Sequence, residues 1–334
     1  MILVAGDIGG TKSHLALFAA QNQELKLLSE EIYRSIDYPG LEEIVCQFLN
    51  SKRTEIGLEQ ISTACLAVAC PVVGERCKMP NLPWTISASG IQEKTGIQDV
   101  QLINDLEASG YGIAQLSEDE IVNLQEGSAD PDGHAALISA GTGLGEALLY
   151  RQENTFVPIA SEGGHADFAP RTGLEIELLK YLLERFQHVS YERVLSGPGL
   201  LNIYHFLRDA GYGQEPGWLK ERLQQGDPSH SIASAALSKE SDLCVQALDL
   251  FVSIYGAEAG NLALKTKAVG GLFVGGGIAP KIVSKLKEGN FRAAFVDKGR
   301  LSGLMERIPI RVILNPDTAL LGAAHLAVQR PIAG

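Results

Sequence analysis

Three glycine-rich turns, each following a short apolar segment, are the parts of this chain best suited to hold a phosphorylated ligand. They are Gly6-Asp7-Ile8-Gly9-Gly10-Thr11, Gly141-Thr142-Gly143-Leu144-Gly145 and Gly275-Gly276-Gly277-Ile278-Ala279-Pro280. Glycine admits positive φ and lets the main chain approach a ligand closely, so that successive backbone N–H groups can converge on an anion. The turns recur at similar intervals along the chain. This recurrence predicts a nucleotide held where two related domains meet.

Asp7 lies inside the first of these turns and has two interpretations. Aspartate commonly accepts hydrogen bonds from the N–H groups of a turn. Alternatively, its carboxylate meets a Mg²⁺ ion bound to the phosphates, directly or through water. The turn lacks the lysine of a P-loop, and the apolar residues 15–18 after it indicate a strand rather than a helix. We favour the phosphate-site interpretation, with a non-P-loop architecture.

Asn104 and Asp105 follow the apolar residues 100–103. A carboxylate at the C-terminal end of a strand occupies the place where open α/β sheets present catalytic groups. An aspartate in this position also serves well as the N-cap of a following helix, here one beginning at Leu106. The local sequence leaves both roles open.

Glu162 and His165 flank a two-glycine turn, and Glu192 precedes a further glycine-rich segment. Taken alone, Glu192 is a solvated or capping residue and His165 a satisfied core histidine. Taken together with Asn104 and Asp105, they suit a neutral polyol, because carboxylates accept from vicinal hydroxyls while Asn and His both donate and accept. No arginine cluster, as an anionic acceptor requires, is found in these segments.

The elements that must position these residues follow an alternating α/β pattern. Apolar strands at 2–5 and 15–18 bracket the first turn, and strands at 135–138 and 147–150 bracket the second, which indicates a structural duplication. Helices are expected at 41–51, from about 87, at 174–186, 197–210, 232–264, 280–287 and 319–328. Residues 211–230, rich in Gly, Pro and polar side chains, are expected to form a surface loop.

Bulk composition excludes several classes of protein. A chain of 334 residues has room for about two domains. Its net charge of −12 argues against nucleic acid or an anionic membrane surface as a partner. The five cysteines have no metal-ligand spacing, and their odd number fits a reducing cytosol. The N-terminus lacks the pattern of a signal peptide, and no apolar stretch approaches the ~18 residues of a membrane span. We expect a soluble, cytoplasmic protein.

The motifs, taken in order, resemble those of bacterial glucokinases of the hexokinase–actin–Hsp70 superfamily, in the group without a zinc site. The resemblance extends from residue 4 to about residue 326. Beyond the glycine turns, it is carried by Ile-Asn-Asp at 103–105, Glu-Gly-Gly-His at 162–165, Glu-Arg-Val-Leu-Ser-Gly-Pro-Gly at 192–199 and Gly-Asn-Leu-Ala-Leu at 260–264. No cysteine follows His165 until Cys244, so a structural zinc is not expected.

The resemblance implies an α/β fold of two actin-like (ribonuclease H-like) domains with the active site in the interdomain cleft. The small domain would comprise residues 1–110 and 314–334, and the large domain residues 111–313. It further implies ATP and Mg²⁺ as cofactors, D-glucose as substrate and a homodimer in the cytoplasm. The implied reaction is transfer of a phosphoryl group from ATP to glucose, the first step of glycolysis.

The resemblance also assigns roles to individual residues. Asp105 would be the general base toward the sugar 6-hydroxyl, and Asn104, Glu162, His165 and Glu192 would bind the other hydroxyls. Asp7 would place the metal. The nucleotide would be held by the three turns, with the terminal phosphates at Gly6, Asp7, Ile8, Gly9, Gly10 and Thr11, the phosphate region at Gly141, Thr142 and Gly143, and the adenosine side at Gly275, Gly276 and Gly277. Ser139, where relatives carry glycine, and residues 211–230 depart from the pattern.

Three alternatives remain beside this interpretation. A kinase for another neutral hexose or an N-acetylhexosamine would use the same fold and similar motifs. A sugar-responsive transcription factor is disfavoured, because the first strand begins at residue 2 and leaves no room for a helix-turn-helix before it. An ATPase or interaction module without a sugar acceptor would lack glucose-dependent ADP release.

Overall fold

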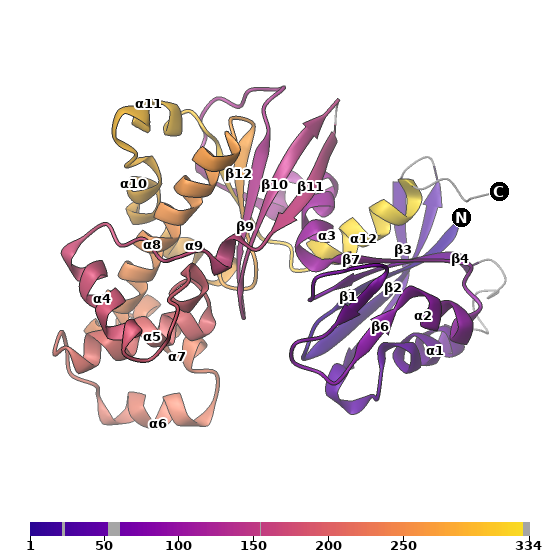
Figure 1. The fold of residues 1–334 in the computed structure, drawn as a ribbon, viewed down its shortest axis with the longest axis horizontal. Helices are drawn as coiled ribbons and strands as arrows, with labels where there is room; N and C mark the ends of the chain where they lie inside the picture. The colour runs from indigo at the N-terminus through magenta and orange to yellow at the C-terminus, as the bar shows by residue number, and fades with distance from the viewer. Residues whose placement is uncertain (22–23, 53–60, 154, 330–334) are drawn as a thin grey trace. The chain divides into compact units, whose positions relative to one another are not determined.

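The computed structural model describes residues 1–21, 24–52, 61–153 and 155–329 (Figure 1). Its contacts divide the chain into two compact units. The first comprises Met1–Ser117, Thr155–Ala160 and Asn315–Gly334, and the second Glu118–Asn154 and Ser161–Leu314. Both contain β-strands and α-helices, so the α/β class predicted from the sequence is confirmed.

The sheet of the first unit has the strand order β3-β2-β1-β4-β7. Strands β1, β2 and β3 form an antiparallel meander, whereas β1, β4 and β7 are parallel. The strands are β1 (Ile2–Ile8), β2 (Lys12–Gln21), β3 (Glu24–Arg34), β4 (Ile61–Val68) and β7 (Asp99–Asn104). The first glycine turn therefore joins two strands, as the sequence predicts, and the structure shows that they are antiparallel.

Alternation along β1 explains why both faces of this sheet are covered. Val4 packs in a core with helices α1 (Leu41–Lys52) and α2 (Ala88–Thr95). Its neighbours Leu3 and Ala5 point to the other face and pack with α3 (Asp105–Gly112) and α12 (Thr318–Gln329). Successive side chains of a strand point to opposite faces, so a strand that is apolar throughout requires two helical layers.

Helices α3 and α12 approach so closely that glycine is required where they meet. A Cβ on Gly322 would overlap the carbonyl group of Ala108, and one on Gly112 would overlap the backbone of Thr318. Figure 1 shows the two helices side by side on the first unit. This contact fixes the helix that begins at Asp105 against the sheet.

A six-stranded sheet has the order β11-β10-β9-β12-β13-β8, and all of its strands except β11 lie in the second unit. Its strands are β8 (Ile121–Gln125), β9 (Ala135–Ala140), β10 (Leu144–Gln152), β11 (Thr155–Ser161), β12 (Gly271–Gly275) and β13 (Ile310–Ile313). As β1 does in the first unit, β9 pairs antiparallel with the next strand and parallel with a later one. The repeated order agrees with the structural duplication inferred from the sequence.

The helices of the second unit surround α8, which is its central helix. They are α4 (Gly173–Leu183), α5 (Gly197–Asp209), α6 (Gly217–Gln225), α7 (Pro228–Leu237), α8 (Asp242–Thr266), α9 (Val283–Leu286), α10 (Asn290–Val296) and α11 (Ser302–Met305). The expectation of no span-length apolar segment needs a correction here. An 18-residue window of α8 has a mean hydropathy of 1.2, but 78% of that window is buried within the protein. Its hydropathy is that of a core helix.

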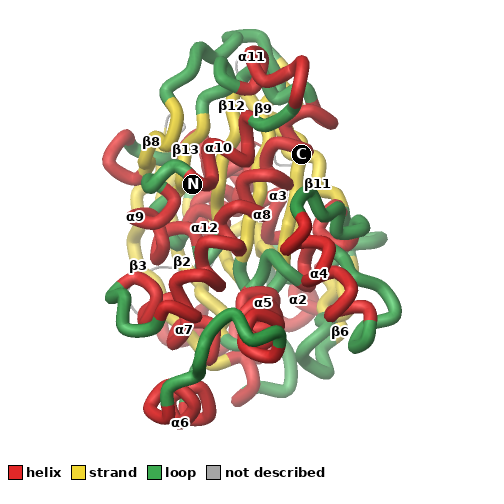
Figure 2. The backbone as a smooth tube through the Cα atoms, turned by 90° about the vertical axis from the view of Figure 1, so that its left-hand side faces the viewer, coloured by secondary structure: helices red, strands yellow, loops and turns green. Residues whose placement is uncertain are grey.

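Two sequence predictions about helices are wrong. Residues 211–230 do not form a loop, because they contain α6 and the start of α7, with Leu219 fully buried. The predicted helix at 232–264 is two helices, since α7 ends at Leu237 and Ser241 caps α8. Capping side chains set the ends of these helices, and the composition of the segment did not indicate them. Figure 2 shows α6 at the edge of the second unit, where Gly, Pro and polar residues are tolerated.

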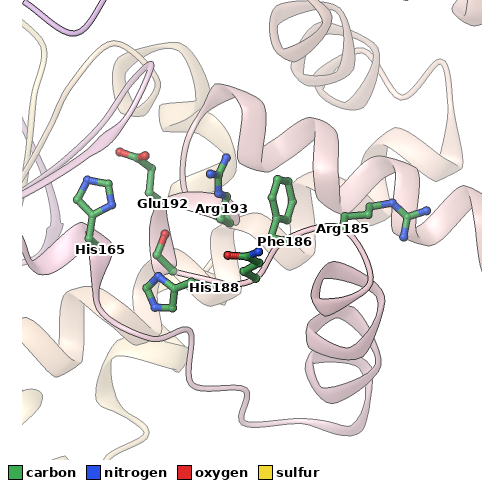
Figure 3. A pocket seen from close by; sticks show the side chains of 8 residues that line it. His165, Arg185, Phe186, His188, Glu192 and Arg193 are labelled. Atoms are coloured by element: carbon green, nitrogen blue, oxygen red, sulfur yellow. The ribbon is translucent and has the colours of Figure 1, made fainter.

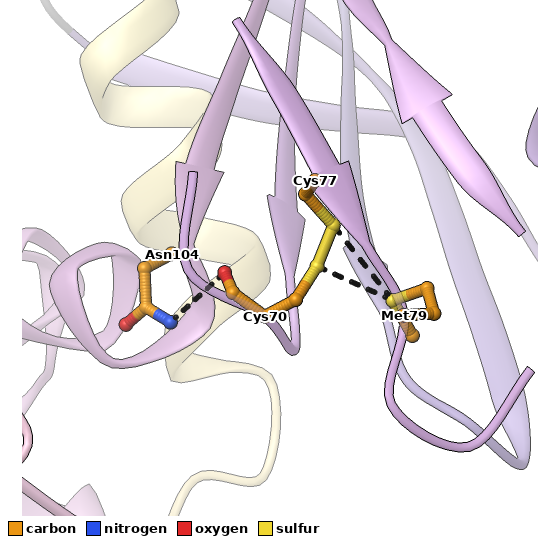
Figure 4. The surroundings of a disulfide bond; sticks show 4 residues. All are labelled: Cys70, Cys77, Met79 and Asn104. Atoms are coloured by element: carbon orange, nitrogen blue, oxygen red, sulfur yellow. Dashed lines mark hydrogen bonds between the residues drawn. A yellow bond between two sulfur atoms is a disulfide. The ribbon is translucent and has the colours of Figure 1, made fainter. Parts of the chain in front are cut away.

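Two cysteines, expected to be reduced, are joined in the structure. A disulfide links Cys70, after β4, to Cys77 in β5 (Arg76–Lys78), which pairs with β6 (Thr85–Ser87) (Figure 4). The Asn104 amide donates a hydrogen bond to the carbonyl oxygen of Cys70 at 3.4 Å. The loop after β4 is thereby tied to the end of β7. Spacing did not indicate this pair, because the two residues meet only after the loop folds back.

Candidate active site

The first glycine motif is mostly strand rather than turn. Gly6, Asp7 and Ile8 belong to β1, and Ile8 is fully buried. A Cβ on Gly6 would lie 2.7 Å from a methyl of Leu66, so this glycine serves core packing. The turn itself, residues 9–11, is closed by the Gly9 N–H, which donates to the Lys12 carbonyl at 2.9 Å. This tip is the part of the motif that lies outside the strands.

Asp7 stands among charged residues that the sequence did not single out. Burial raises the pKa of its carboxyl, Asp317 adds to the rise, and Lys12 and His14 oppose it. His14 lies directly opposite Asp7 in the β1–β2 register. Its Nδ1 is 3.3 Å from Asp317 Oδ1, a hydrogen-bonding interaction that raises the pKa of His14 despite burial. The strand register could have revealed His14, but nothing local indicates Asp317.

At the end of β7, the structure separates the two roles left open for Asp105. Asn104 is the N-cap of α3, with its Oδ1 accepting from the N–H groups of Leu106 and Glu107. Asp105 is the first helical residue, and its Oδ1 accepts from the Leu106 N–H at 2.9 Å. Capping therefore belongs mainly to Asn104.

The environment of Asp105 suits a group that accepts a proton. Burial, followed by the negative charge of Asp7, raises the pKa of Asp105 to about 6. Within the first unit, the two carboxyls thus interact. A carboxylate whose pKa lies nearer to neutral accepts a proton more readily than an ordinary aspartate. The arrangement can serve general base catalysis.

In the second unit, the turn at 141–143 fixes Glu192. The Leu144 N–H donates to Glu192 Oε2 at 3.0 Å, and Glu192 belongs to a 3₁₀ turn, Tyr191–Arg193. A Cβ on Gly143 would lie only 2.5 Å from the same oxygen. Glycine at this position therefore makes room for the Glu192 carboxylate, which is held rather than freely solvated.

The turn at 275–277 lies beside the turn at 141–143. Gly276 has a φ of +83°, and a Cβ there would overlap the backbone of Ala140. The Ile278 N–H donates to the Ala140 carbonyl at 3.2 Å. Two of the three predicted nucleotide-binding turns are therefore brought together at the ends of β9 and β12.

The segment 162–165 forms a 3₁₀ turn, Gly163–His165, against β10. Glu162 and His165 are exposed, with side chains 73% and 61% accessible. His165 is therefore no core histidine. A Cβ on Gly164 would overlap the Leu144 carbonyl, so this turn lies on the same strand whose backbone holds Glu192.

His165 and Glu192 line one pocket of about 330 Å³ (Figure 3). Its other lining residues are Arg185, Phe186, Gln187, His188, Ser190 and Arg193. The Arg193 guanidinium stacks over the Phe186 ring at 4.3 Å. The sequence did not single out Arg193 or His188, although their proximity to Glu192 in the chain was a signal.

The candidate residues thus form two groups. The first unit brings together Asp7, Asn104 and Asp105, and the second brings together Glu162, His165, Glu192 and the turns at 141–143 and 275–277. In the part of the chain that the structure describes, no cluster of three or more His, Cys, Asp or Glu side chains could hold a metal ion by itself. A cation at Asp7 would therefore need ligands from elsewhere, such as phosphate oxygens and water.

Solved structures of other proteins have the same fold as this chain. A glucokinase from an Antarctic psychrotroph superposes with a TM-score of 0.84 at 30% identity, covering 98% of this chain and 99% of the other. The glucokinase of Balamuthia mandrillaris, solved in complex with glucose, superposes with a TM-score of 0.83 at 25% identity, covering 98% and 93% of the two chains. The fold is that of a sugar kinase.

Sequence comparison shows which family of sugar kinases the chain resembles. The Glucokinase family profile matches residues 4–330. A glucokinase from Nostoc punctiforme is 44% identical, with 98% of this chain and 99% of the relative covered. The chain belongs to the glucokinase family.

Proposed function

We propose that this protein transfers the terminal phosphoryl group of ATP to the 6-hydroxyl of D-glucose, with Asp105 as the general base. Its membership in the glucokinase family over nearly the whole chain carries the reaction itself. The observation that supports Asp105 is its position: a partly buried carboxyl following β7, interacting with Asp7, with a raised pKa. As the 6-hydroxyl attacks, Asp105 takes its proton.

Sugar recognition falls to Asn104, Glu162, His165 and Glu192. Their carboxylate, amide and imidazole groups accept from and donate to vicinal hydroxyls, and an analogue that leaves them unpaired is rejected. The Asn104 amide is already engaged with α3 and with Cys70, so its position is fixed before sugar arrives. The Balamuthia mandrillaris glucokinase, solved with glucose, supports glucose as the ligand.

Phosphate binding falls to backbone N–H groups of the three turns, with Thr142 and Thr11 beside them. Asp7 fits a Mg²⁺ site, because its partly buried carboxyl and that of Asp105 interact and place negative charge near each other. A bound Mg²⁺ would neutralise charge on the transferring phosphoryl group. In this chain, Asp7 would hold the ion, and Lys12 and His14 would balance the remaining charge.

The larger assignments remain part of the same proposal. They are membership in the hexokinase–actin–Hsp70 superfamily, an active site in the cleft between domains 1–110 plus 314–334 and 111–313, a homodimer, and a cytoplasmic location. The repeated sheet order supports the first of these. The division of sugar-binding residues between two compact units supports the second.

The decisive experiment is the Asp105→Asn variant. Asparagine keeps the shape and caps a helix about as well, but does not accept the proton. We expect kcat to fall about 10²–10⁴-fold and glucose Kd to change less than about tenfold. A fall in kcat of less than about tenfold would remove Asp105 as the base.

Phosphorylation of another neutral hexose is the second candidate. ADP release measured with glucose, fructose, mannose and N-acetylglucosamine separates the two, with kcat/KM as the quantity compared. We expect glucose to have the highest value. Equal turnover without any sugar would instead indicate an ATPase.

A further inference from the structure

A buried carboxyl group that the proposed mechanism does not use lies beneath one of the sugar-binding turns. Glu146 in β10 is 1% exposed, and its Oε1 is buried without a hydrogen-bond partner among the described residues. Glu258 of α8, 0% exposed, interacts with it side chain to side chain. Two ionised carboxylates only accept, so neither satisfies the other. One shared proton converts their contact into a hydrogen bond.

The Glu146 carboxyl occupies the space directly below Gly163. A Cβ on Gly163 would overlap Glu146 Oε2. The Ser161 hydroxyl donates to the Glu146 carbonyl at 3.0 Å and accepts from the Gly163 N–H at 3.2 Å. The turn that carries Glu162 and His165 therefore rests on Glu146.

Glu258 connects the pair to the second sugar-binding segment. The Asn261 amide donates to Glu258 Oε2 at 2.8 Å and to the Tyr191 hydroxyl at 3.1 Å. Tyr191 is the residue before Glu192 and is 3% exposed. One buried network thus supports both the turn at 162–165 and the turn at 191–193.

The charges around the pair are few. Lys265 donates to Glu258 Oε1 at 3.2 Å, and Lys298 donates to Asn261 Oδ1 at 2.7 Å, with Arg171 acting on Lys298 from farther away. Burial and then Glu258 raise the pKa of Glu146 to about 7, and Lys265 opposes the rise. The Glu146 carboxyl therefore loses its proton near neutral pH.

We propose that Glu146 is a positioning residue for glucose: by sharing one proton with Glu258, it supports the turn that presents Glu162 and His165, and loss of that proton weakens glucose binding. The inference rests on the proposed sugar-binding role of those two residues. Below neutral pH the shared proton holds the carboxyls together. Above it, two buried negative charges repel each other and displace the turn from below.

The first test is the pH dependence of glucose Kd, measured by calorimetry between about pH 6 and about pH 9. In the unmodified enzyme Kd should rise about three- to tenfold over this range, since the proton is lost near neutral pH. Glu146→Gln supplies a permanent donor to Glu258, so its Kd should stay low and nearly constant while kcat is retained. Glu215→Gln is the control, because Glu215 is a largely buried carboxylate of the same unit that bonds Tyr204 and Arg208 instead.

A Glu146→Gln variant that keeps the pH profile of the unmodified enzyme would overturn the proposal.

A second test applies even if that variant folds poorly. Gly163→Ala should weaken glucose binding at least tenfold, because its methyl group meets the Glu146 carboxyl. Combining it with Glu146→Ala frees the space, so the double variant should bind better than the sum of the two losses predicts. Additive losses would contradict the contact.

Glu162→Gln separates this inference from the function on which it rests. If Glu162→Gln leaves glucose Kd unchanged while Glu146→Gln abolishes the pH dependence, the role of Glu162 fails and the support by Glu146 stands. If Glu162→Gln weakens binding while Glu146→Gln behaves like the unmodified enzyme, the positioning role fails alone.

Discussion

Asp105 is partly buried and interacts with the negative charge of Asp7, and both effects raise its pKa. Burial is the larger cause of its raised pKa and Asp7 the second. The native state retains the Asp105 proton to a higher pH than the unfolded chain does. This contribution to the free energy of unfolding therefore falls as pH rises from about 4 to about 6. Folding therefore disfavours the ionised form of Asp105, which is the form that acts as the base.

The acid limb of the pH profile should consequently respond to Asp7. kcat/KM for glucose should rise with pH through about 6, as Asp105 loses its proton. Asp7→Asn removes the repulsive charge, so the limb should move about one pH unit lower, in addition to any loss of kcat. Asp37→Asn, an exposed aspartate beside Arg34, should leave the limb in place. An unmoved limb in Asp7→Asn would show that the two carboxyls act independently.

Glu192 should contribute to glucose affinity through its charge. Glu192→Gln keeps an oxygen for the Leu144 N–H but loses the charge-assisted bonds to sugar hydroxyls. Binding should weaken by about 1–3 kcal/mol. Titration calorimetry measures this, with Glu184→Gln, a 79% exposed side chain of the same unit, as the control. Equal affinities for both variants would make Glu192 a structural residue only.

At the scale of elements, the packing of α3 against α12 holds Asp105 in position. Asp105 begins α3, and α3 is held by α12 at a contact where only glycine fits. The disulfide between Cys70 and Cys77 fixes the neighbouring loop, which also accepts the Asn104 amide. The end of β7 that carries Asn104 and leads into Asp105 is thus held from two sides within the first unit.

Gly322→Ala should therefore disturb catalysis from a distance. Its methyl group would overlap the Ala108 carbonyl, so α12 must move away from α3. We expect a loss of about 2–4 kcal/mol in unfolding free energy, as for other overpacked cores, and a lower kcat. Thermal unfolding and steady-state rates measure the two effects. Gly303→Ala is the matched control, because a Cβ there meets no atom within 4 Å; equal behaviour of the two variants would contradict the packing argument.

At the scale of the whole molecule, the proposed site divides its sugar ligands between two compact units. A glucose molecule bound to the proposed residues of both units would connect the two units. Closure around substrate is a common way for kinases to exclude water from phosphoryl transfer.

Glucose should accordingly lower the radius of gyration measured by small-angle X-ray scattering, by about a few per cent. A double variant, Glu162→Gln with Glu192→Gln, removes ligands from the second unit and should show a much smaller change at the same glucose concentration. An identical change in both proteins would place glucose binding elsewhere.

How far the sequence predicts this structure depends on the range of the interaction. The strands beside the glycine turns are local, and the sequence predicts them, whereas the N-cap of α3 is Asn104 rather than the predicted Asp105. Asp317 beside His14, and Glu146 beneath Gly163, arise from contacts between distant segments, which no spacing indicates. The composition of residues 211–230 also gave a wrong prediction, because the segment contains α6 and the start of α7. The roles of the individual site residues stay predictions until the variants above are measured.

The position of α12 in the chain affects how the protein is made. Leu320, Ala323 and Ala324 complete a core with Leu3 and Ala5, although more than a whole unit of sequence separates them. During synthesis, one face of the first sheet is covered by α3 alone until the last helix is made, while the second unit can complete its core earlier. A nascent chain therefore exposes apolar strand surface for most of its translation. Changes in α12 would therefore affect chaperone dependence during synthesis as well as equilibrium stability.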